Sequence, residues 1–133
     1  METFNKDYRD LYQTNIGKEK PKFGKFFLCP CCFFPTLSER AGYEICPLCN
    51  WEDDGQDDPL ANEVWGGPNG DYSLSEARTN FSKFIIMYRL TDSAHQQTLK
   101  QIDSKKRIIG KYNALFEDET DALWNEIFIM EKR

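Results

Sequence analysis

Five cysteines that fall within 21 residues are the side chains of this sequence best suited to chemistry. Four of them form two C-x-x-C pairs, at 29–32 and 46–49, with thirteen residues between the pairs. A two-residue gap lets both thiolates of a tight turn point at one ion, while backbone N–H groups of the turn hydrogen-bond to the sulfurs. The spacing therefore predicts one tetrahedral metal site, with the ligands Cys29, Cys32, Cys46 and Cys49.

The ligand set favours zinc, although iron bound by four thiolates has the same ligands and stays an alternative. Four thiolates leave no open coordination position, so we expect one structural Zn²⁺ per chain. Disulfides are disfavoured because the cysteine count is odd and the first residues, METFNKDYRD, lack the pattern of a signal peptide. A thioredoxin-type site would need a βαβ pattern around Cys29, which the sequence does not show.

Cys31 is the cysteine outside both pairs, and two hypotheses stay open for it. It packs as a small hydrophobic residue, or it is exposed as a reactive thiol. The residue that follows each pair closes the turn, for which a left-handed backbone is suitable. Asn50 adopts that conformation readily after the second pair, whereas Phe33 is less suited to it after the first.

An acidic segment follows the cysteines. Residues 39–76 contain ten acidic side chains and one arginine, whereas the rest of the chain has a net charge of +4. The WEDDGQDDP block at 51–59 is the centre of this segment, and it predicts an acidic loop that docks a basic partner. The predicted contact residues are Glu52, Asp53, Asp54, Asp57 and Asp58. An EF-hand is excluded because Ala61 stands where its bidentate glutamate would be, while a weaker cation site or a turn-capping role stays open.

The elements that position these residues follow from the apolar spacing. An amphipathic stripe predicts a helix near the N-terminus, and β-prone runs at 26–28 and 43–45 lead into the cysteine pairs. Residues 51–72 are expected to form a loop. Helical spacing then predicts three helices, over 74–90, over 94–116 and from 117 onward.

We therefore expect an α+β fold, with a small zinc-ribbon-like β core and two cysteine knuckles, followed by two or three α-helices. The predicted organisation is an N-terminal helix over residues 1–14, a linker over 15–25, a zinc-ribbon-like domain over 26–81 and a helical extension over 82–133.

Four motifs in the stretch 29–81 are distinctive: CPCC, a CPxC-x-WEDDGQDDP block, GGPNG and SLxEAR. With these motifs the stretch resembles the bacterial cysteine-rich CPCC domain family over about two-fifths of the chain. The resemblance implies a zinc-binding module, and it implies no particular biochemical activity.

Composition narrows the remaining classes of function. A net charge of −5 and a pI near 4.9 make nucleic acid an unexpected partner. No apolar run reaches the roughly 20 residues of a membrane span, so we expect a cytoplasmic protein. The single histidine, His95, is expected to be solvated, and no catalytic motif is present, so we expect no enzyme.

The function that the sequence favours is a structural-zinc protein that binds another protein through its acidic loop, as an inhibitor or immunity protein would. The alternatives are a zinc-ribbon accessory factor of nucleic-acid machinery and a thiol redox protein that uses Cys31. The oligomeric state stays open.

Overall fold

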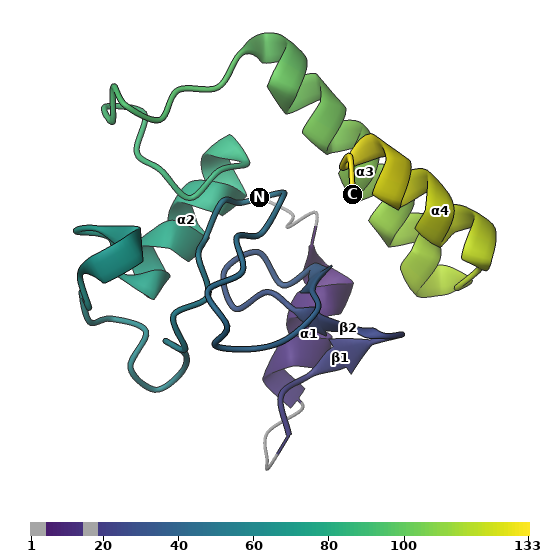
Figure 1. Ribbon diagram of the computed structural model, residues 1–133, viewed down its shortest axis with the longest axis horizontal. Helices are drawn as coiled ribbons and strands as arrows, with labels where there is room; N and C mark the ends of the chain where they lie inside the picture. The colour runs from purple at the N-terminus through teal and green to yellow at the C-terminus, as the bar shows by residue number, and fades with distance from the viewer. Residues whose placement is uncertain (1–4, 15–18) are drawn as a thin grey trace.

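The computed structural model describes residues 5–14 and 19–133, and this part of the chain contains one small antiparallel sheet and four α-helices (Figure 1). The α+β class predicted from the sequence is therefore confirmed. The strands are β1 (Lys22–Phe23), β2 (Phe26–Leu28) and β3 (Pro35–Leu37), in the order β1-β2-β3. The two turns that join them are the β1–β2 hairpin and the first cysteine pair.

The sheet extends beyond the strand that the sequence indicated. The predicted linker over 15–25 contains β1, in which Phe23 pairs with Phe26, and its residues 15–18 lie outside the described part. β3 was not expected because it is only three residues long and begins at a proline. Pro35 is tolerated there because it stands at the first position of the strand, where it pairs with Leu28.

The second cysteine pair lies in a hairpin with very little regular strand. The predicted strand over 43–45 is reduced to a single bridge, between Ile45 and Glu52. Tyr43 N–H donates to the Asp53 carbonyl at 2.9 Å and Asp53 N–H donates to the Glu44 carbonyl at 3.0 Å, which extends this ladder. Residues 51–72 form the expected loop, interrupted by a short 3₁₀ helix, η1 (Gly67–Asn69).

The helices are α1 (Lys6–Thr14), α2 (Leu74–Phe84), α3 (Leu99–Glu117) and α4 (Asp121–Met130). Three boundaries differ clearly from the predictions, and one of them is the start of α4, which lies at Asp121 after the cap Thr120, four residues later than predicted. Residues 1–4 of the predicted N-terminal helix lie outside the described part. α2 ends at Phe84, six residues early, because Ile85 adopts the left-handed conformation (φ 61°) and its N–H bonds to the Phe81 carbonyl. α3 begins five residues late because Thr98 and Gln101 form a reciprocal capping box, which fixes the start there.

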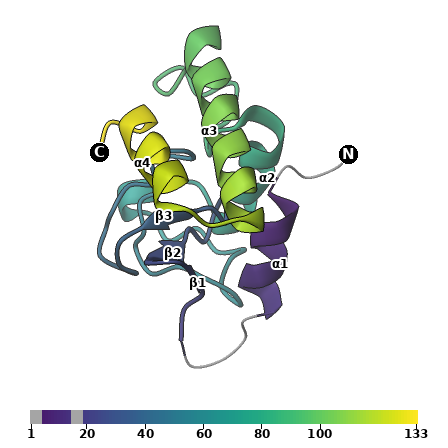
Figure 2. The same cartoon turned by 90° about the vertical axis from the view of Figure 1, so that its right-hand side faces the viewer.

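The hydrophobic core joins all parts of the chain. Figure 2 shows α3 and α4 side by side over the sheet, with α1 against the lower end of α3. Tyr8 of α1 is fully buried, and its hydroxyl donates to the Tyr112 carbonyl of α3 at 2.5 Å. The Tyr8 ring meets the edges of Phe23 and Phe116. One cluster of buried side chains therefore includes the cysteines and residues from each helix. No helix of the described residues is long and apolar enough to cross a membrane.

Candidate metal centre

Four buried thiols lie close together, two from the turn between β2 and β3 and two from the second cysteine hairpin. The Sγ atoms of Cys29, Cys32, Cys46 and Cys49 all lie within 4.8 Å of one another. Cys29 and Cys49 are separated by 3.6 Å between sulfurs, and so are Cys32 and Cys46. A tetrahedral Zn²⁺ with Zn–S bonds of about 2.3 Å needs sulfurs about 3.8 Å apart, and a disulfide needs about 2.05 Å. The four thiols are therefore positioned to bind one metal ion, and none is in a disulfide.

The first pair is held by a tight turn between β2 and β3. Cys29 N–H donates to the Phe34 carbonyl at 2.9 Å, and Phe33 N–H donates to the Cys29 carbonyl at 2.8 Å. Phe33 closes the turn with φ 71°, the left-handed conformation for which an aromatic residue is poorly suited. Its ring is buried against Tyr12, with centroids 5.2 Å apart, and Arg78 lies over it. This burial offsets the backbone cost of about 1–2 kcal/mol.

The second pair repeats the same turn. Cys46 N–H donates to the Trp51 carbonyl at 2.9 Å, and Asn50 N–H donates to the Cys46 carbonyl at 3.0 Å. Asn50 has φ 72°, so the left-handed conformation expected for it is confirmed. The side chain of Trp51 is fully buried directly after the turn. The two turns are therefore equivalent halves that face one another across the thiols.

Polar groups near the sulfurs complete the centre. Backbone N–H groups of Cys31 and Trp51 point to the sulfurs of Cys29 and Cys49, each at 3.4 Å. The Thr36 hydroxyl lies 3.1 Å from the Cys46 sulfur. Sequence reasoning missed Thr36, because nothing in the spacing of a single threonine shows that β3 directs it to the thiols. Such bonds to sulfur stabilise thiolate ligands and fix their orientation.

The electrostatics of the site are set by the burial of its thiols. Burial raises the pKa of Cys29, Cys32 and Cys49, whereas hydrogen bonds from the other three thiols lower the pKa of Cys46 against the effect of burial. A bound divalent ion would hold all four as thiolates at neutral pH. Lys105 of α3 is a nearby positive group whose pKa is lowered by burial, although the thiols counteract this. Its ammonium donates to the Ile85 carbonyl at 3.1 Å. Four thiolates around Zn²⁺ would carry a net charge of −2, which the half-buried Lys105 would partly balance.

Cys31 is buried, with 1% of its surface exposed, and burial raises its pKa. The structure thus places it as a packed side chain, and it has neither the exposure nor the low pKa of a reactive thiol.

The acidic loop is engaged mostly within the chain. Asp53 is fully buried, where it accepts hydrogen bonds from Arg40 Nε at 2.9 Å and from Ala41 N at 2.7 Å. Asp57 accepts from the Tyr12 hydroxyl at 2.6 Å and pairs with Lys20. Asp53 therefore does not face a partner, which corrects its predicted role. Its buried position follows from the need to pair the equally buried Arg40.

The remaining acidic residues are more accessible. Glu52 and Asp54 are half-buried, and Asp54 caps the turn by accepting from Gln56 N at 3.0 Å. The Asp58 side chain is 58% exposed and pairs with Arg78. In the described part of the chain the four cysteines are the only cluster suited to a metal, so the weaker cation site on the aspartates gains no support.

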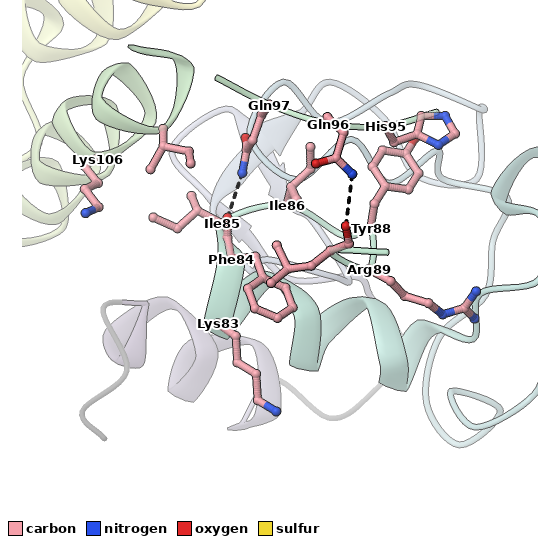
Figure 3. Close-up of a pocket in the computed structure, with 12 residues that line it drawn as sticks. Lys83, Phe84, Ile85, Ile86, Tyr88, Arg89, His95, Gln96, Gln97 and Lys106 are labelled. Atoms are coloured by element: carbon pink, nitrogen blue, oxygen red, sulfur yellow. Dashed lines mark hydrogen bonds between the residues drawn. The ribbon is translucent and has the colours of Figure 1, made fainter. Parts of the chain in front are cut away.

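A pocket of about 250 Å³ lies between the end of α2, the segment that follows it and the first half of α3 (Figure 3). His95 lines it, stacked on the Tyr88 ring at 3.8 Å, and its Nδ1 lies 3.1 Å from Asp92. Gln97 also lines it and donates to the Phe84 carbonyl at 2.7 Å. These polar groups hold the chain's own loop in place, so we assign the pocket no catalytic role.

Comparison with known proteins gives one match. The family model described as Cysteine-rich CPCC matches residues 27–101, which is more than half of the chain. The match covers both cysteine pairs, the acidic loop and α2. No curated protein and no solved structure matches the chain.

Proposed function

The chain belongs to the cysteine-rich CPCC family, and from this premise we propose that it is a non-enzymatic protein with one structural Zn²⁺ that docks a basic protein partner through its acidic loop. The observation that carries the zinc assignment is the set of four buried Sγ atoms within 4.8 Å of one another. All four positions of a tetrahedral ion are then protein thiolates, which leaves none for a substrate. Zinc fits better than iron because a closed four-thiolate site needs no redox chemistry to explain it.

The partner proposal depends on charge. The segment 39–76 has a net charge of −9, and ion pairs to three cations of other segments, Lys20, Arg78 and Arg89, balance only part of it. Glu52, Asp54 and Asp58 remain partly exposed on this loop. A cationic surface would be attracted to them, and its association would be fast and sensitive to salt. An inhibitor or immunity protein that covers a cationic protein has this chemistry.

A role with nucleic acid is less well supported. The basic residues of α3 are largely engaged: Arg107 pairs with Asp103, Lys111 pairs with Glu126, and Lys105 is directed to the interior. These contacts reduce the positive charge that α3 can offer to phosphates. The free thiols fit a reducing compartment, so a cytoplasmic location is part of the proposal.

Metal content tests the first half of the proposal. Protein purified without added metal is analysed for its elements, and its thiols are titrated before and after chelation. We expect one zinc per chain and thiols that react only after chelation, together with loss of the fold. Iron in place of zinc, or the absence of metal from folded protein, would overturn the zinc assignment.

Partner capture tests the second half. The protein is immobilised, and bound proteins are identified by mass spectrometry at low and high salt. The test variant carries Glu52→Gln, Asp54→Asn and Asp58→Asn, and a control with the same charge change carries substitutions on the exposed residues Asp10, Glu117 and Asp118. We expect a basic protein that the control retains and the test variant loses. Equal retention by both variants would refute docking through the loop.

A further inference from the structure

We propose that a pocket between α4 and the β1–β2 hairpin binds one arginine side chain of the basic partner. The pocket has a volume of about 330 Å³, and it is separate from both the thiols and the acidic loop. Residues of the hairpin, of the α3–α4 turn and of one stripe of α4 form its walls: Lys25, Phe26, Glu119, Asp121, Trp124, Asn125 and Phe128. The inference rests on the proposed function in one respect, namely that the partner is basic.

The hairpin approaches α4 closely because of one glycine. Gly24 has φ +62°, and a Cβ there would lie 2.5 Å from Glu119 Oε2 and 3.1 Å from Trp124 Cζ2. Any other residue would push the hairpin from the helix or displace those side chains. The hairpin therefore lies directly against Glu119 and Trp124, two residues that line the pocket.

Three aromatic rings form the apolar part of the pocket. The centroids of Phe26 and Trp124 are 5.1 Å apart, those of Phe26 and Phe128 are 5.5 Å apart, and those of Trp124 and Phe128 are 5.7 Å apart. Aromatic faces carry negative potential and attract cations that lie within about 6 Å. Trp124 is the strongest of the three in this respect.

The chain itself shows that these rings accept a guanidinium. The Arg133 guanidinium lies 5.4 Å from the centroid of Phe26 and 5.6 Å from that of Phe128. Arg133 does not line the pocket, so it contacts the two rings from outside it. This internal contact favours arginine over lysine as the occupant, because a planar guanidinium also stacks on aromatic faces.

Two carboxylates add the charge that selects a cation. Glu119 accepts a hydrogen bond from Trp124 Nε1 at 2.9 Å, which fixes the carboxylate beside the indole. Asp121 stands at the first position of α4. Within the described ranges, 5–14 and 19–133, neither carboxylate is in an ion pair. Lys25 contributes one positive charge at the rim, so the acidic groups of the pocket outnumber the basic ones.

The test uses a small probe, N-acetyl-arginine methylamide, and the intact protein. The three tryptophan Nε1–H resonances are followed by NMR during a titration, and a Trp65→Phe variant identifies the signal of the exposed Trp65. We expect the Trp124 signal to shift to saturation while the Trp51 and Trp65 signals stay unchanged. The matched probe N-acetyl-glutamate methylamide should leave all three signals in place.

Two conservative variants locate the contact. Phe128→Leu should weaken probe binding about two- to fivefold, the effect of one cation–π contact at an exposed site. Asp121→Asn should weaken it and reduce its dependence on salt, and both variants should keep the far-UV spectrum of the parent. An unchanged Trp124 signal, or equal shifts of all three tryptophans, would overturn the inference.

Partner capture separates this inference from the proposed function. If the partner is lost from the acidic-loop variant but retained by Phe128→Leu and Asp121→Asn, the pocket plays no part and docking through the loop stands. If the pocket variants also lose the partner, the pocket is a second contact of the same interface.

Discussion

Glu131, directly after α4, is a buried carboxylate whose removal should stabilise the protein. Its side chain is 1% exposed, and its Oε2 accepts a hydrogen bond from the Tyr112 hydroxyl at 2.8 Å. Arg133 Nε lies 3.0 Å from Oε1, yet that oxygen has no aligned hydrogen bond. Burial raises the pKa of Glu131 from 4.5 to about 7, against the opposing influence of Arg133. The folded protein therefore disfavours the charged form.

The sign of the effect follows from proton binding. Between pH 4.5 and 7 the folded chain holds a proton on Glu131 that the unfolded chain releases, so stability falls as pH rises through this range. Relative to a pH well below 4.5, the free energy of unfolding is lower by about 2 kcal/mol at pH 6 and by about 3 kcal/mol at pH 8. Glu131→Gln keeps an acceptor for Tyr112 and has no charge to bury. We therefore expect it to be more stable than the parent, by a margin that grows by about 1 kcal/mol from pH 6 to pH 8.

Urea unfolding followed by circular dichroism measures this difference, in buffers with excess zinc so that the metal site stays saturated over the pH range. Glu126→Gln is the matched control because Glu126 lies on α4, close to Glu131 in the chain, but is exposed and pairs with Lys111. The control should change stability by less than about 1 kcal/mol at every pH. A Glu131→Gln variant that is less stable than the parent at pH 8, or a margin that does not change with pH, would refute this reasoning.

Three further predictions concern the thiols, the buried ion pair and the left-handed turn. Cys46→Ser should abolish the cooperative fold, because a structural zinc contributes about 10–16 kcal/mol and a domain has only about 5–15 kcal/mol of stability. Cys31→Ala, in contrast, should still bind one zinc. Elemental analysis measures the zinc content of both variants, and circular dichroism measures whether they fold. Arg40→Met should cost about 3–5 kcal/mol in urea unfolding, because it leaves the Asp53 carboxylate buried without its partner, and a cost below about 1 kcal/mol would contradict that pairing. Asn50→Val should lower the free energy of unfolding by about 1–2 kcal/mol because the backbone at this position has φ 72°, whereas Asn50→Gly should be about as stable as the parent. Equal melting temperatures for the two variants would contradict a left-handed turn.

Sequence patterns predicted the parts of this molecule that depend on local spacing. The two C-x-x-C turns need only two intervening residues each, so the sequence alone shows which four cysteines can meet. The α2 start at Leu74, which was predicted correctly, is equally local, because Ser73 directly before it accepts a hydrogen bond from Glu76 N. In contrast, the end of α2 at Phe84 could not be predicted, because the next residue, Ile85, is β-branched and such a residue rarely adopts a left-handed backbone without support from tertiary contacts.

The acidic loop shows why charge patterning is a weaker guide than cysteine spacing. A run of aspartates in a sequence predicts a solvent-exposed surface unless the positions of the lysine and arginine side chains that pair with them are known. Arg40 pairs with Asp53 across 13 residues, and Lys20 pairs with Asp57 across 37. Those partners are set by the fold, so the sequence could give the net charge of the loop but not the share of it that reaches the surface.

Contacts from distant segments converge on the cysteine turns, and this convergence couples metal binding to the whole fold. The Asn5 amide, just before α1, donates to the Cys32 carbonyl at 2.8 Å, and Met87 N–H, after α2, donates to the Cys49 carbonyl at 2.9 Å. Arg133, after α4, donates to the Thr36 carbonyl at 2.7 Å. Without a metal the buried thiols lose the ion that holds the two turns together, and these three contacts lose their fixed acceptors. The metal site and the helices should therefore unfold as one cooperative unit.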